Sequence, residues 1–219
     1  MTEKAMNSAP KFGGFPVSAL DFYEDLEDDN SKAFWASHKA IYDADVRAPM
    51  VALLAELEPE FGAGKIFRPY RDVRFSKNKA PYKTHQGAYV AAAPSVGWYV
   101  QIDASGLFVA GGFYGGTSEQ VSALRKTLDD DKRGRDLENA VTAVLGQDYE
   151  IGGDKLKTRP RGVPEDHPRL DLMRHKSLTV SRAYVSPDWL TTTRTLDMVR
   201  EDWRAFQPLI DGLVAATAT

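Results

Sequence analysis

Residues 98–114 read WYVQIDASGLFVAGGFY, and this stretch decides the expected fold. Its first six residues place Trp, Val and Ile at every second position, which is typical of a strand with one buried face. A short Ala-Ser-Gly turn at 104–106 leads into a second apolar run that ends at Tyr114. The stretch therefore predicts a β-hairpin, with the Gly-Gly pair at 111–112 as a bulge in the second strand.

Helical periodicity flanks the hairpin on both sides. Capping residues and apolar residues at helical spacing predict three helices before it and three after it. The expected helices span about 19–28 after a cap at Ser18, from Asn30 or Ser31 to 47, from Pro49 to 57, 117–128, 133–145, and the C-terminus after Ser186. Further strands are predicted at about 65–75, 86–93 and 177–185, and a short helix at 167–176.

The predicted fold class is α+β. We expect a single domain over residues 17–219, built of a mainly antiparallel sheet with helices packed at its N- and C-terminal ends. The sequence shows no internal repeat, low-complexity tract or linker that would divide this domain. Residues 1–16 hold two prolines and a Gly-Gly pair and are predicted to form a flexible arm.

Composition excludes several classes of protein. The chain of 219 residues has no cysteine, which excludes disulfide frameworks, thiolate zinc sites and cysteine nucleophiles. No apolar run approaches the roughly 18 residues of a membrane span, and the N-terminal residues lack the apolar core of a secretory signal. We therefore expect a cytoplasmic protein with no membrane partner.

The net charge of −3 hides a strong segregation of charge. Residues 68–85 carry six Arg or Lys and one Asp, and residues 155–176 carry seven Arg or Lys and three acids. All other residues together have a net charge of −12. If the fold brings the two cationic segments together, they would create a positive potential that attracts anions.

The first cationic segment, RPYRDVRFSKNKAPYK at 68–83, is the strongest motif. Arginine presents a planar fork of donors that matches carboxylate and phosphate oxygens. The predicted anion ligands are Arg68, Arg71, Arg74, Lys79 and Lys83, with Tyr82 as a hydrogen-bond donor. Asp72 is expected to orient the arginines, and arginine neighbours should lower the pKa of its carboxyl group.

The second cationic segment adds Lys157, Arg174 and Lys176 to the predicted anion ligands. His175 lies between two of these cations and is the candidate proton carrier, with Asp72 as the other tentative catalytic residue. Because no HxH, HExxH or HxxE pattern occurs, we expect no metal site. The glycine-rich stretch at 111–117 lacks the lysine of a P-loop, and no cofactor is expected.

Three functions fit this pattern. The first is a basic pocket for a small ligand that bears phosphate or carboxylate, with or without catalysis. The second is a nucleic-acid-binding module, in which Phe67, Tyr70, Phe75 and Tyr82 stack on bases while cations follow the phosphates. The third is structural, with the motif forming ion pairs to the acidic N-terminal helices. The pattern predicts no particular oligomeric state.

The first cationic segment also resembles the signature of a bacterial family of uncharacterised proteins, domain of unknown function 2461. The resemblance extends from about Phe15 to Val185 and includes a segment around Phe34-Trp35 and another from Lys155 to Lys176. Asn78 and Ala80 stand where relatives commonly have aspartate and serine, so no role that needs those groups is carried over. The resemblance implies no established activity, cofactor or substrate, and it favours a site within residues 71–83.

Overall fold

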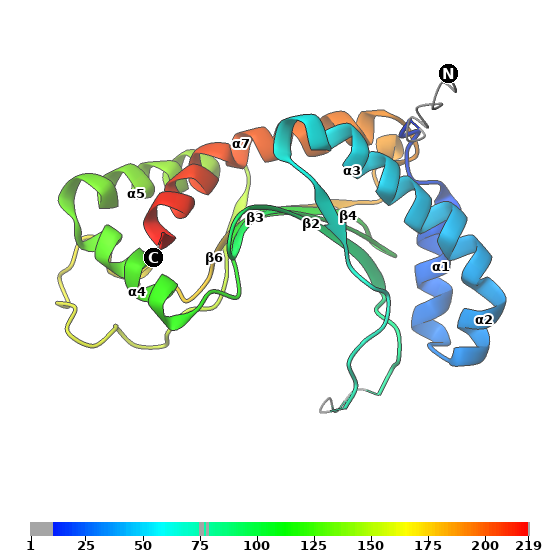
Figure 1. Ribbon diagram of the computed structural model, residues 1–219, viewed down its shortest axis with the longest axis horizontal. Helices are drawn as coiled ribbons and strands as arrows, with labels where there is room; N and C mark the ends of the chain where they lie inside the picture. The colour runs from blue at the N-terminus through cyan, green and yellow to red at the C-terminus, as the bar shows by residue number, and fades with distance from the viewer. Residues whose placement is uncertain (1–10, 75–76, 78, 219) are drawn as a thin grey trace, which may run out of the picture. The chain divides into compact units, whose positions relative to one another are not determined.

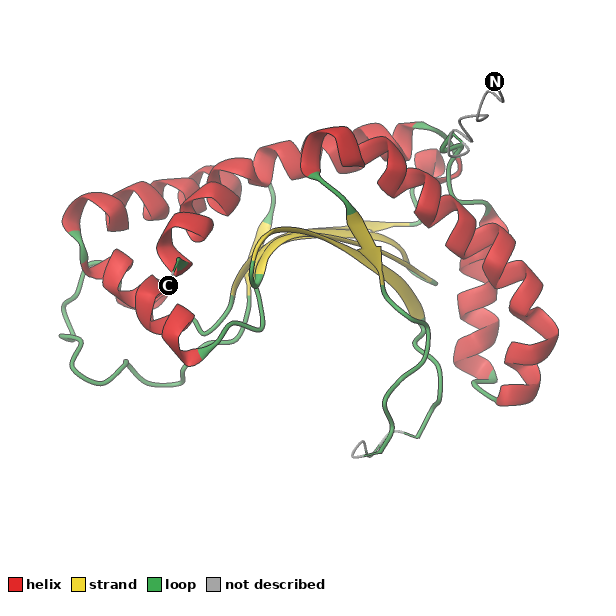
Figure 2. Cartoon of the chain, viewed as in Figure 1, coloured by secondary structure: helices red, strands yellow, loops and turns green. Residues whose placement is uncertain are grey.

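The computed structural model describes residues 11–218 except residues 75, 76 and 78 (Figure 1). The chain forms a six-stranded sheet with the strand order β1-β2-β3-β4-β6-β5, and helices before, within and after it (Figure 2). The helices are α1 (Val17–Asp28), α2 (Lys32–Ile41), a π-helical turn (Tyr42–Arg47), α3 (Ala48–Phe61), α4 (Ser118–Asp129), α5 (Asp131–Leu145), α6 (Leu170–Met173), a 3-10 turn (Asp188–Thr191) and α7 (Arg194–Thr217). The strands are β1 (Gly64–Ile66), β2 (His85–Ala93), β3 (Val96–Asp103), β4 (Gly106–Phe113), β5 (Glu150–Gly152) and β6 (Leu178–Val185).

The predicted α+β class is confirmed, with an antiparallel sheet and helices toward both ends of the chain. The predicted hairpin is β3 and β4, in which Trp98, Val100 and Ile102 are buried while the residues between them are half-buried. At the sheet edge β5 pairs antiparallel with β6, and Ile151 lies opposite Val180. Among the described residues, no helix combines the length and apolarity that crossing a membrane requires.

The described residues group into two compact units, and several strands and α7 contribute to both. The first unit contains α1 to α3, β1, the beginning of β2, residues 101–107 and residues 185–198. The second unit contains residues 89–100, 108–184 and 199–219, which include α4, α5 and most of α7. In the second unit Trp98 donates its indole N–H to the carbonyl of Trp203, which fixes α7 against β3.

Two helix starts in the first unit can be compared with the predicted capping residues. The predicted cap at Ser31 is confirmed, because its hydroxyl accepts a hydrogen bond from the Phe34 amide. The predicted cap at Ser18 is wrong: Pro16 precedes the helix, and the Ser18 hydroxyl instead donates to Asp45 at 2.7 Å. Further on, α2 continues through the π-helical turn into α3 without leaving the helical conformation, so Pro49 stands near the start of α3 rather than after a break.

The predicted strand at 65–75 is mostly a loop. Among its described residues only those of β1 form a strand. Residues 67–84 are here called the basic loop, and its described parts, 67–74 and 79–84, leave β1 and lead into β2 (Figure 1). The two sides of the loop are joined by an isolated antiparallel bridge between Tyr70 and Tyr82. Pro69 and Pro81 flank this bridge, and because proline has no amide hydrogen, it cannot extend the ladder by donating.

Of the short helix predicted at 167–176, only α6 (Leu170–Met173) is helical. Its C-terminal side ends early because the chain pairs with a neighbouring segment: the Leu156 amide donates to the Arg174 carbonyl and the Lys176 amide donates to the Asp154 carbonyl. An isolated bridge between Lys155 and His175 completes this contact. The segment therefore satisfies its backbone groups by strand-like pairing rather than by a further helical turn.

The last part of the predicted flexible arm, residues 11–16, packs against the first unit, while residues 1–10 lie outside the described part of the chain. Phe12 and Phe15 are buried, and their rings meet edge to face at 5.4 Å between centroids. The Phe15 amide donates to the Leu190 carbonyl at 2.9 Å. Two large aromatic side chains make this segment a part of the core, because their burial outweighs the freedom that nearby glycines give the chain.

Gly14 is a strict requirement of that packing. Its φ is +109°, and a Cβ atom there would lie 2.2 Å from the carbonyl carbon of Thr191. We predict that Gly14→Ala lowers the free energy of unfolding by more than about 1 kcal/mol. Gly13→Ala is the matched control, because a Cβ there meets nothing within 4 Å. Urea denaturation of both variants checks this, and equal stability of the two would contradict it.

Candidate functional site

The basic loop is anchored by an aromatic stack in the first unit. The ring of Tyr82 lies parallel to the indole of Trp35, with 4.2 Å between centroids and 6° between planes. Tyr82 is only 5% exposed, so burial adds to the stacking energy. Asn30 holds the backbone at the same point: its carbonyl oxygen accepts from the Tyr82 amide at 3.0 Å and its amide donates to the Tyr82 carbonyl at 3.2 Å.

Gln86, four residues after Tyr82, also faces the helices of the first unit. The Tyr42 hydroxyl donates to the side-chain oxygen of Gln86 at 2.6 Å, and burial raises the pKa of Tyr42 to about 12. The Gln86 amide in turn donates to the Phe67 carbonyl at 2.9 Å. Since side chains in extended chain alternate between two sides, Tyr82 and Gln86 define the helix side of residues 81–86.

Lys83 and His85 therefore point to the opposite side, and the bonds across the loop place Arg71 with them. The Lys83 amide donates to the Pro69 carbonyl at 2.8 Å. The Arg71 amide donates to the Pro81 carbonyl at the same distance. In an antiparallel pair, opposite residues share a side, so Arg71 lies on the side of Lys83. The Lys83 ammonium lies 5.3 Å above the ring of Phe67.

Arg68, Arg71 and Lys83, here called the loop-base cations, form a cluster of like charge. Burial lowers the pKa of Lys83, and repulsion by Arg68 and then Arg71 lowers it further. Among the described residues, the ion pair found in the basic loop joins Arg74 to Asp72, and none involves a loop-base cation. The predicted network of ion pairs between this segment and the acidic helices is therefore not found in the described part of the chain.

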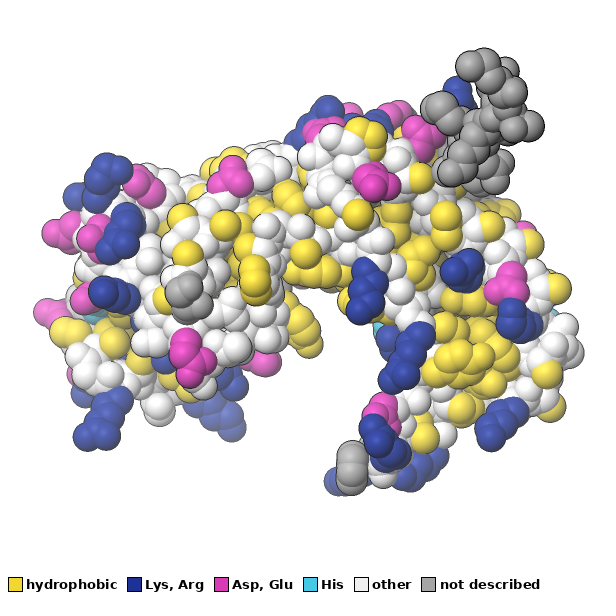
Figure 3. Space-filling view, in the orientation of Figure 1, with side chains coloured by type: hydrophobic (Ala, Val, Ile, Leu, Met, Phe, Trp, Pro, Cys, Tyr) yellow, Lys and Arg dark blue, Asp and Glu magenta, His cyan; other side chains and the backbone are white. Residues whose placement is uncertain are grey.

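The outer part of the basic loop is held by its own polar groups. Asp72 accepts two hydrogen bonds from the Arg74 guanidinium, at 2.9 and 2.6 Å, and these bonds lower the pKa of its carboxyl group. The Lys79 ammonium donates to the Val73 carbonyl at 3.0 Å. Asp72 thus orients Arg74. Figure 3 shows Lys and Arg side chains gathered along this loop. Phe75, a predicted stacking residue, lies outside the described residues.

His85 and Asp103 join the loop-base cations without having been predicted as site residues. Burial and Lys83 lower the pKa of His85, Asp103 opposes this shift, and Arg71 lowers the pKa further. Asp103 is fixed in place, since it accepts from the Gln101 side-chain amide and from the Ser105 amide, both at 2.8 Å. The alternation of Gln101 and Asp103 with buried apolar residues carried the signal, because it places both on the half-buried side of β3.

The second cationic segment lies in the second unit, and most of its charges have partners. Lys155 pairs with Asp171 at 2.7 Å, and Arg159 pairs with Glu165 at 3.2 Å. Arg174 donates to the carbonyls of residues 156 and 157, both at 3.0 Å, and lies 3.8 Å from Asp171. The other two predicted ligands here, Lys157 and Lys176, are exposed.

His175 is buried rather than open to solvent. It is 1% exposed, and its Nδ1–H donates to the Ser177 carbonyl at 2.7 Å. Its Nε2 is enclosed and has no hydrogen-bond partner within the described residues. Burial lowers the pKa of His175, which keeps the imidazole neutral. These contacts position the segment that pairs with Lys155.

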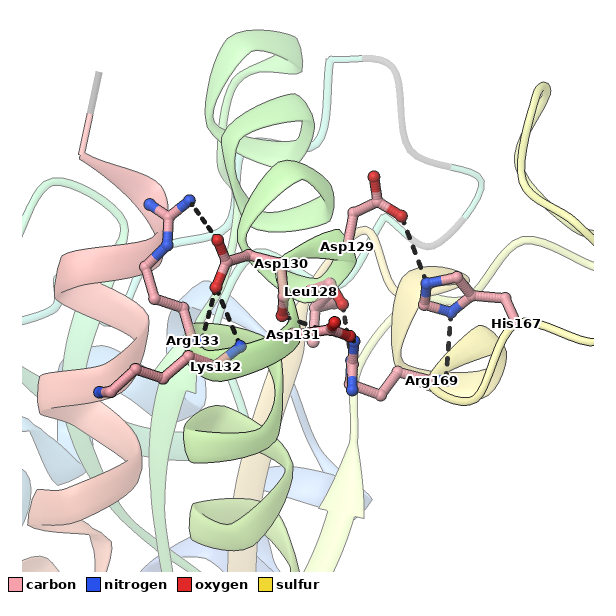
Figure 4. Close-up of polar contacts among 8 residues, drawn as sticks. All are labelled: Leu128, Asp129, Asp130, Asp131, Lys132, Arg133, His167 and Arg169. Atoms are coloured by element: carbon pink, nitrogen blue, oxygen red, sulfur yellow. Dashed lines mark hydrogen bonds and ion pairs between the residues drawn. The ribbon is translucent and has the colours of Figure 1, made fainter.

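Arg169 and His167 of the second segment bind at the junction between α4 and α5 (Figure 4). The buried Arg169 guanidinium donates to the Leu128 carbonyl at 2.6 Å and lies 3.9 Å from the Asp131 carboxylate. His167 accepts from the Arg169 amide through Nδ1, so its Nε2 carries the hydrogen that faces Asp129 at 3.4 Å. Asp130 caps α5 by accepting from the amides of residues 132 and 133. These groups stabilise a helix junction.

The sequence also yielded no prediction for a buried carboxylate in the second unit. Asp202 of α7 is 1% exposed and accepts hydrogen bonds from the hydroxyls of Tyr149, at 2.8 Å, and Tyr184, at 3.0 Å. Arg182 lies 3.4 Å away and covers the Tyr149 ring at 4.0 Å. Burial raises the pKa of Asp202, and the bonds from the two hydroxyls oppose that shift. Its place next to Trp203 on the buried face of α7 was the available signal.

The predicted site residues thus fall into two groups. Those from Arg68 to Lys83 lie in the first unit, and those from Lys157 to Lys176 lie in the second. Within the first group the backbone bonds place Arg71 and Lys83 on one side of the loop, and Arg68 acts on the charge of Lys83. The structure places Tyr82 on the opposite side of the chain. The combined pocket made by both segments stays a prediction.

Comparison with known proteins assigns the family. The family model described as "conserved hypothetical protein (DUF2461)" matches residues 18–211. The chain belongs to the DUF2461 family. No curated protein and no solved structure matches the chain. The predicted family resemblance is confirmed, and in this DUF2461 protein the described residues hold no cluster of three or more His, Asp or Glu suited to a metal ion.

The anchor of the basic loop gives a testable expectation for this DUF2461 protein. Asn30→Ala removes both hydrogen bonds to the Tyr82 backbone, so we predict faster hydrogen exchange at the amide of Tyr82, by about fivefold if the bond contributes about 1 kcal/mol. Asn139→Ala, at an exposed position of α5, is the matched control and should leave this amide unchanged. Exchange measured by NMR checks the expectation, and unchanged protection in Asn30→Ala would contradict it.

Proposed function

We propose that the protein binds an oxyanion, carried by a phosphate- or carboxylate-bearing small ligand, at the loop-base cations. The observation that carries the proposal is the cluster itself. The backbone bonds place Arg71 and Lys83 on one side of the loop. Arg68 and Arg71 both repel the charge of Lys83, and among the described residues none of the three forms an ion pair. A cluster of like charges costs free energy, and a bound anion removes that cost.

The backbone holds the cluster in place before any ligand arrives. Arg71 and Lys83 have their amides bonded across the loop, and the Tyr82 ring is stacked on Trp35 behind them. Because the chain is already ordered there, an anion binds without the cost of ordering the loop base. The two arginines offer forked donors for paired oxygens, and Lys83 offers a compact charge.

The other predicted ligands have a different place in this proposal. Arg74 and Lys79 are engaged within the basic loop, with Asp72 and the Val73 carbonyl respectively. They contribute by shaping the outer loop and by adding long-range positive potential. Arg174 is likewise committed to carbonyls of the second unit, and Lys157 and Lys176 are exposed cations outside the cluster.

A second candidate function is binding of single-stranded nucleic acid. The observation that favours it is Tyr70, which is 48% exposed and lies beside the Tyr82 ring, 5.4 Å between centroids. An exposed ring next to cations can stack on a base while the cations contact phosphates. Phe67 and Tyr82, the other two described candidates, are engaged by Lys83 and Trp35.

Calorimetric titration with inorganic phosphate at low ionic strength tests the leading proposal. We predict that Arg71→Gln and Lys83→Gln each weaken binding by about tenfold or more, because a hydrogen bond to a charged group contributes about 1.5–3 kcal/mol. Arg135→Gln, which changes an exposed arginine of α5, should bind like the wild type. Thermal melts confirm that the variants are folded.

Two outcomes decide against the leading proposal. Equal phosphate affinity in all four proteins would show that the loop-base cations are not the site. Strong binding of a single-stranded oligonucleotide that falls steeply with salt, and falls again in Tyr70→Ala, would favour the second candidate instead.

A further inference from the structure

His85 occupies a distinctive position beside the loop-base cations. It is the first residue of β2 and follows Lys83 by two positions, so both side chains lie on the same side of the chain. The neighbouring Gln86 points the other way, because its side chain bonds to the Tyr42 hydroxyl. His85 is half-buried, so its ring is partly accessible at the base of the loop. The first unit therefore presents an imidazole next to the loop-base cations.

The charged groups that act on His85 come from two elements. Lys83 and Arg71 act from the basic loop and Asp103 acts from β3. Asp103 is oriented by bonds from Gln101 and Ser105, so its charge is fixed. The imidazole thus has two cations on the loop and one fixed carboxylate on the sheet. A carboxylate that faces a histidine favours the imidazolium form, and the cations favour the neutral form.

An anion at the loop base changes this balance. When the charges of Arg71 and Lys83 are compensated by a ligand, their repulsion on an imidazolium disappears while the attraction of Asp103 remains. Binding of the anion and uptake of a proton by His85 must then favour each other, and by linkage the effect is reciprocal. The same imidazolium supplies an N–H donor for an oxygen of the ligand.

We propose that His85 is part of the loop-base site and acts there as its proton carrier, taking up a proton from solvent when a phosphate-bearing ligand binds. This inference rests on the proposed anion-binding function and narrows its ligand to phosphate monoesters or free phosphate. Three clustered cations and a protonatable base match a dianion better than the single charge of a carboxylate. A phosphate monoester loses its second proton near pH 6, in the range where histidine titrates.

The direct test is an NMR titration of the histidine side chains in the full wild-type chain labelled with ¹³C and ¹⁵N at histidine. The signals are assigned with single histidine-to-glutamine variants, and pH is scanned without phosphate, in saturating inorganic phosphate and in acetate. We expect phosphate to raise the pKa of His85 by about one unit, the size of effect that a nearby opposite charge produces. Acetate should raise it less.

His38 is the matched control within the first unit. It stacks on Phe34 and bonds to the Phe34 carbonyl, and its ring signals should not shift when phosphate is added. Arg71→Gln supplies the second check, because removal of one cation should raise the pKa of His85 before any phosphate is added and reduce the further response to phosphate.

A calorimetric measurement gives an independent readout. Phosphate binding between pH 6 and 7, measured in two buffers of different ionisation enthalpy, should take up more protons in the wild type than in His85→Gln, because the proton that phosphate itself releases is common to both proteins and the difference is the proton taken up by His85. Phosphate binding without a change in the pKa of His85 would overturn this inference and leave the proposed function standing. Absence of phosphate binding would overturn both. An equal response to acetate would overturn the narrowing to phosphate.

Discussion

The stack of Tyr82 on Trp35 is the contact on which the candidate site depends. Loop residues alternate between two sides, so fixing one ring against the helices decides where every neighbour points. With Tyr82 turned toward Trp35 and held by Asn30, Lys83 and His85 must turn away from the helices. An aromatic pair contributes about 0.5–1.5 kcal/mol beyond its buried area. Here the stack also sets which way the neighbouring side chains point, so that Arg71 and Lys83 lie on one side of the loop.

The two units treat positive charge differently. In the second unit Lys155, Arg159 and Arg174 pair with carboxylates or carbonyls, and the buried Arg169 fixes a helix junction. These cations stabilise the fold by satisfying neighbouring groups. In the first unit the loop-base cations lie beside one another, and their repulsion is felt in the pKa values of Lys83 and His85. This mutual repulsion at the base of one loop is the feature that we propose a bound anion relieves.

The sequence predicted the regular parts of the fold well because their signals are local. The period of two at Trp98, Val100 and Ile102 led to the β3–β4 hairpin, and Ser31 marked the start of α2. The strand predicted at 65–75 rested on aromatic and β-branched composition, whereas Pro69 and Pro81 prevent a continuous ladder in the basic loop. The cap at Ser18 failed because Asp45, distant in sequence, competes for its hydroxyl.

The candidate site was predictable in its residue types but not in its geometry. The count of charges identified Arg68, Arg71 and Lys83, yet only the bonds across the loop show that Lys83 and Arg71 share a side. The same bonds place Tyr82 on the other side of the chain. Asp103, which is held by Gln101 and Ser105, acts on His85, whereas His175 is buried. Such pairings between distant residues leave no local pattern in the chain, so composition alone could not rank the two histidines.

The central claim is that the base of the basic loop, rather than the second cationic segment, receives an anion. The most direct measurement is a two-dimensional ¹H–¹⁵N spectrum of the protein titrated with inorganic phosphate at constant ionic strength. We predict saturable shifts of the amide signals of Arg68, Arg71, Lys83 and His85, with the signals of residues 155–176 unchanged. Shifts confined to residues 155–176, or no saturable shift at all, would contradict the account.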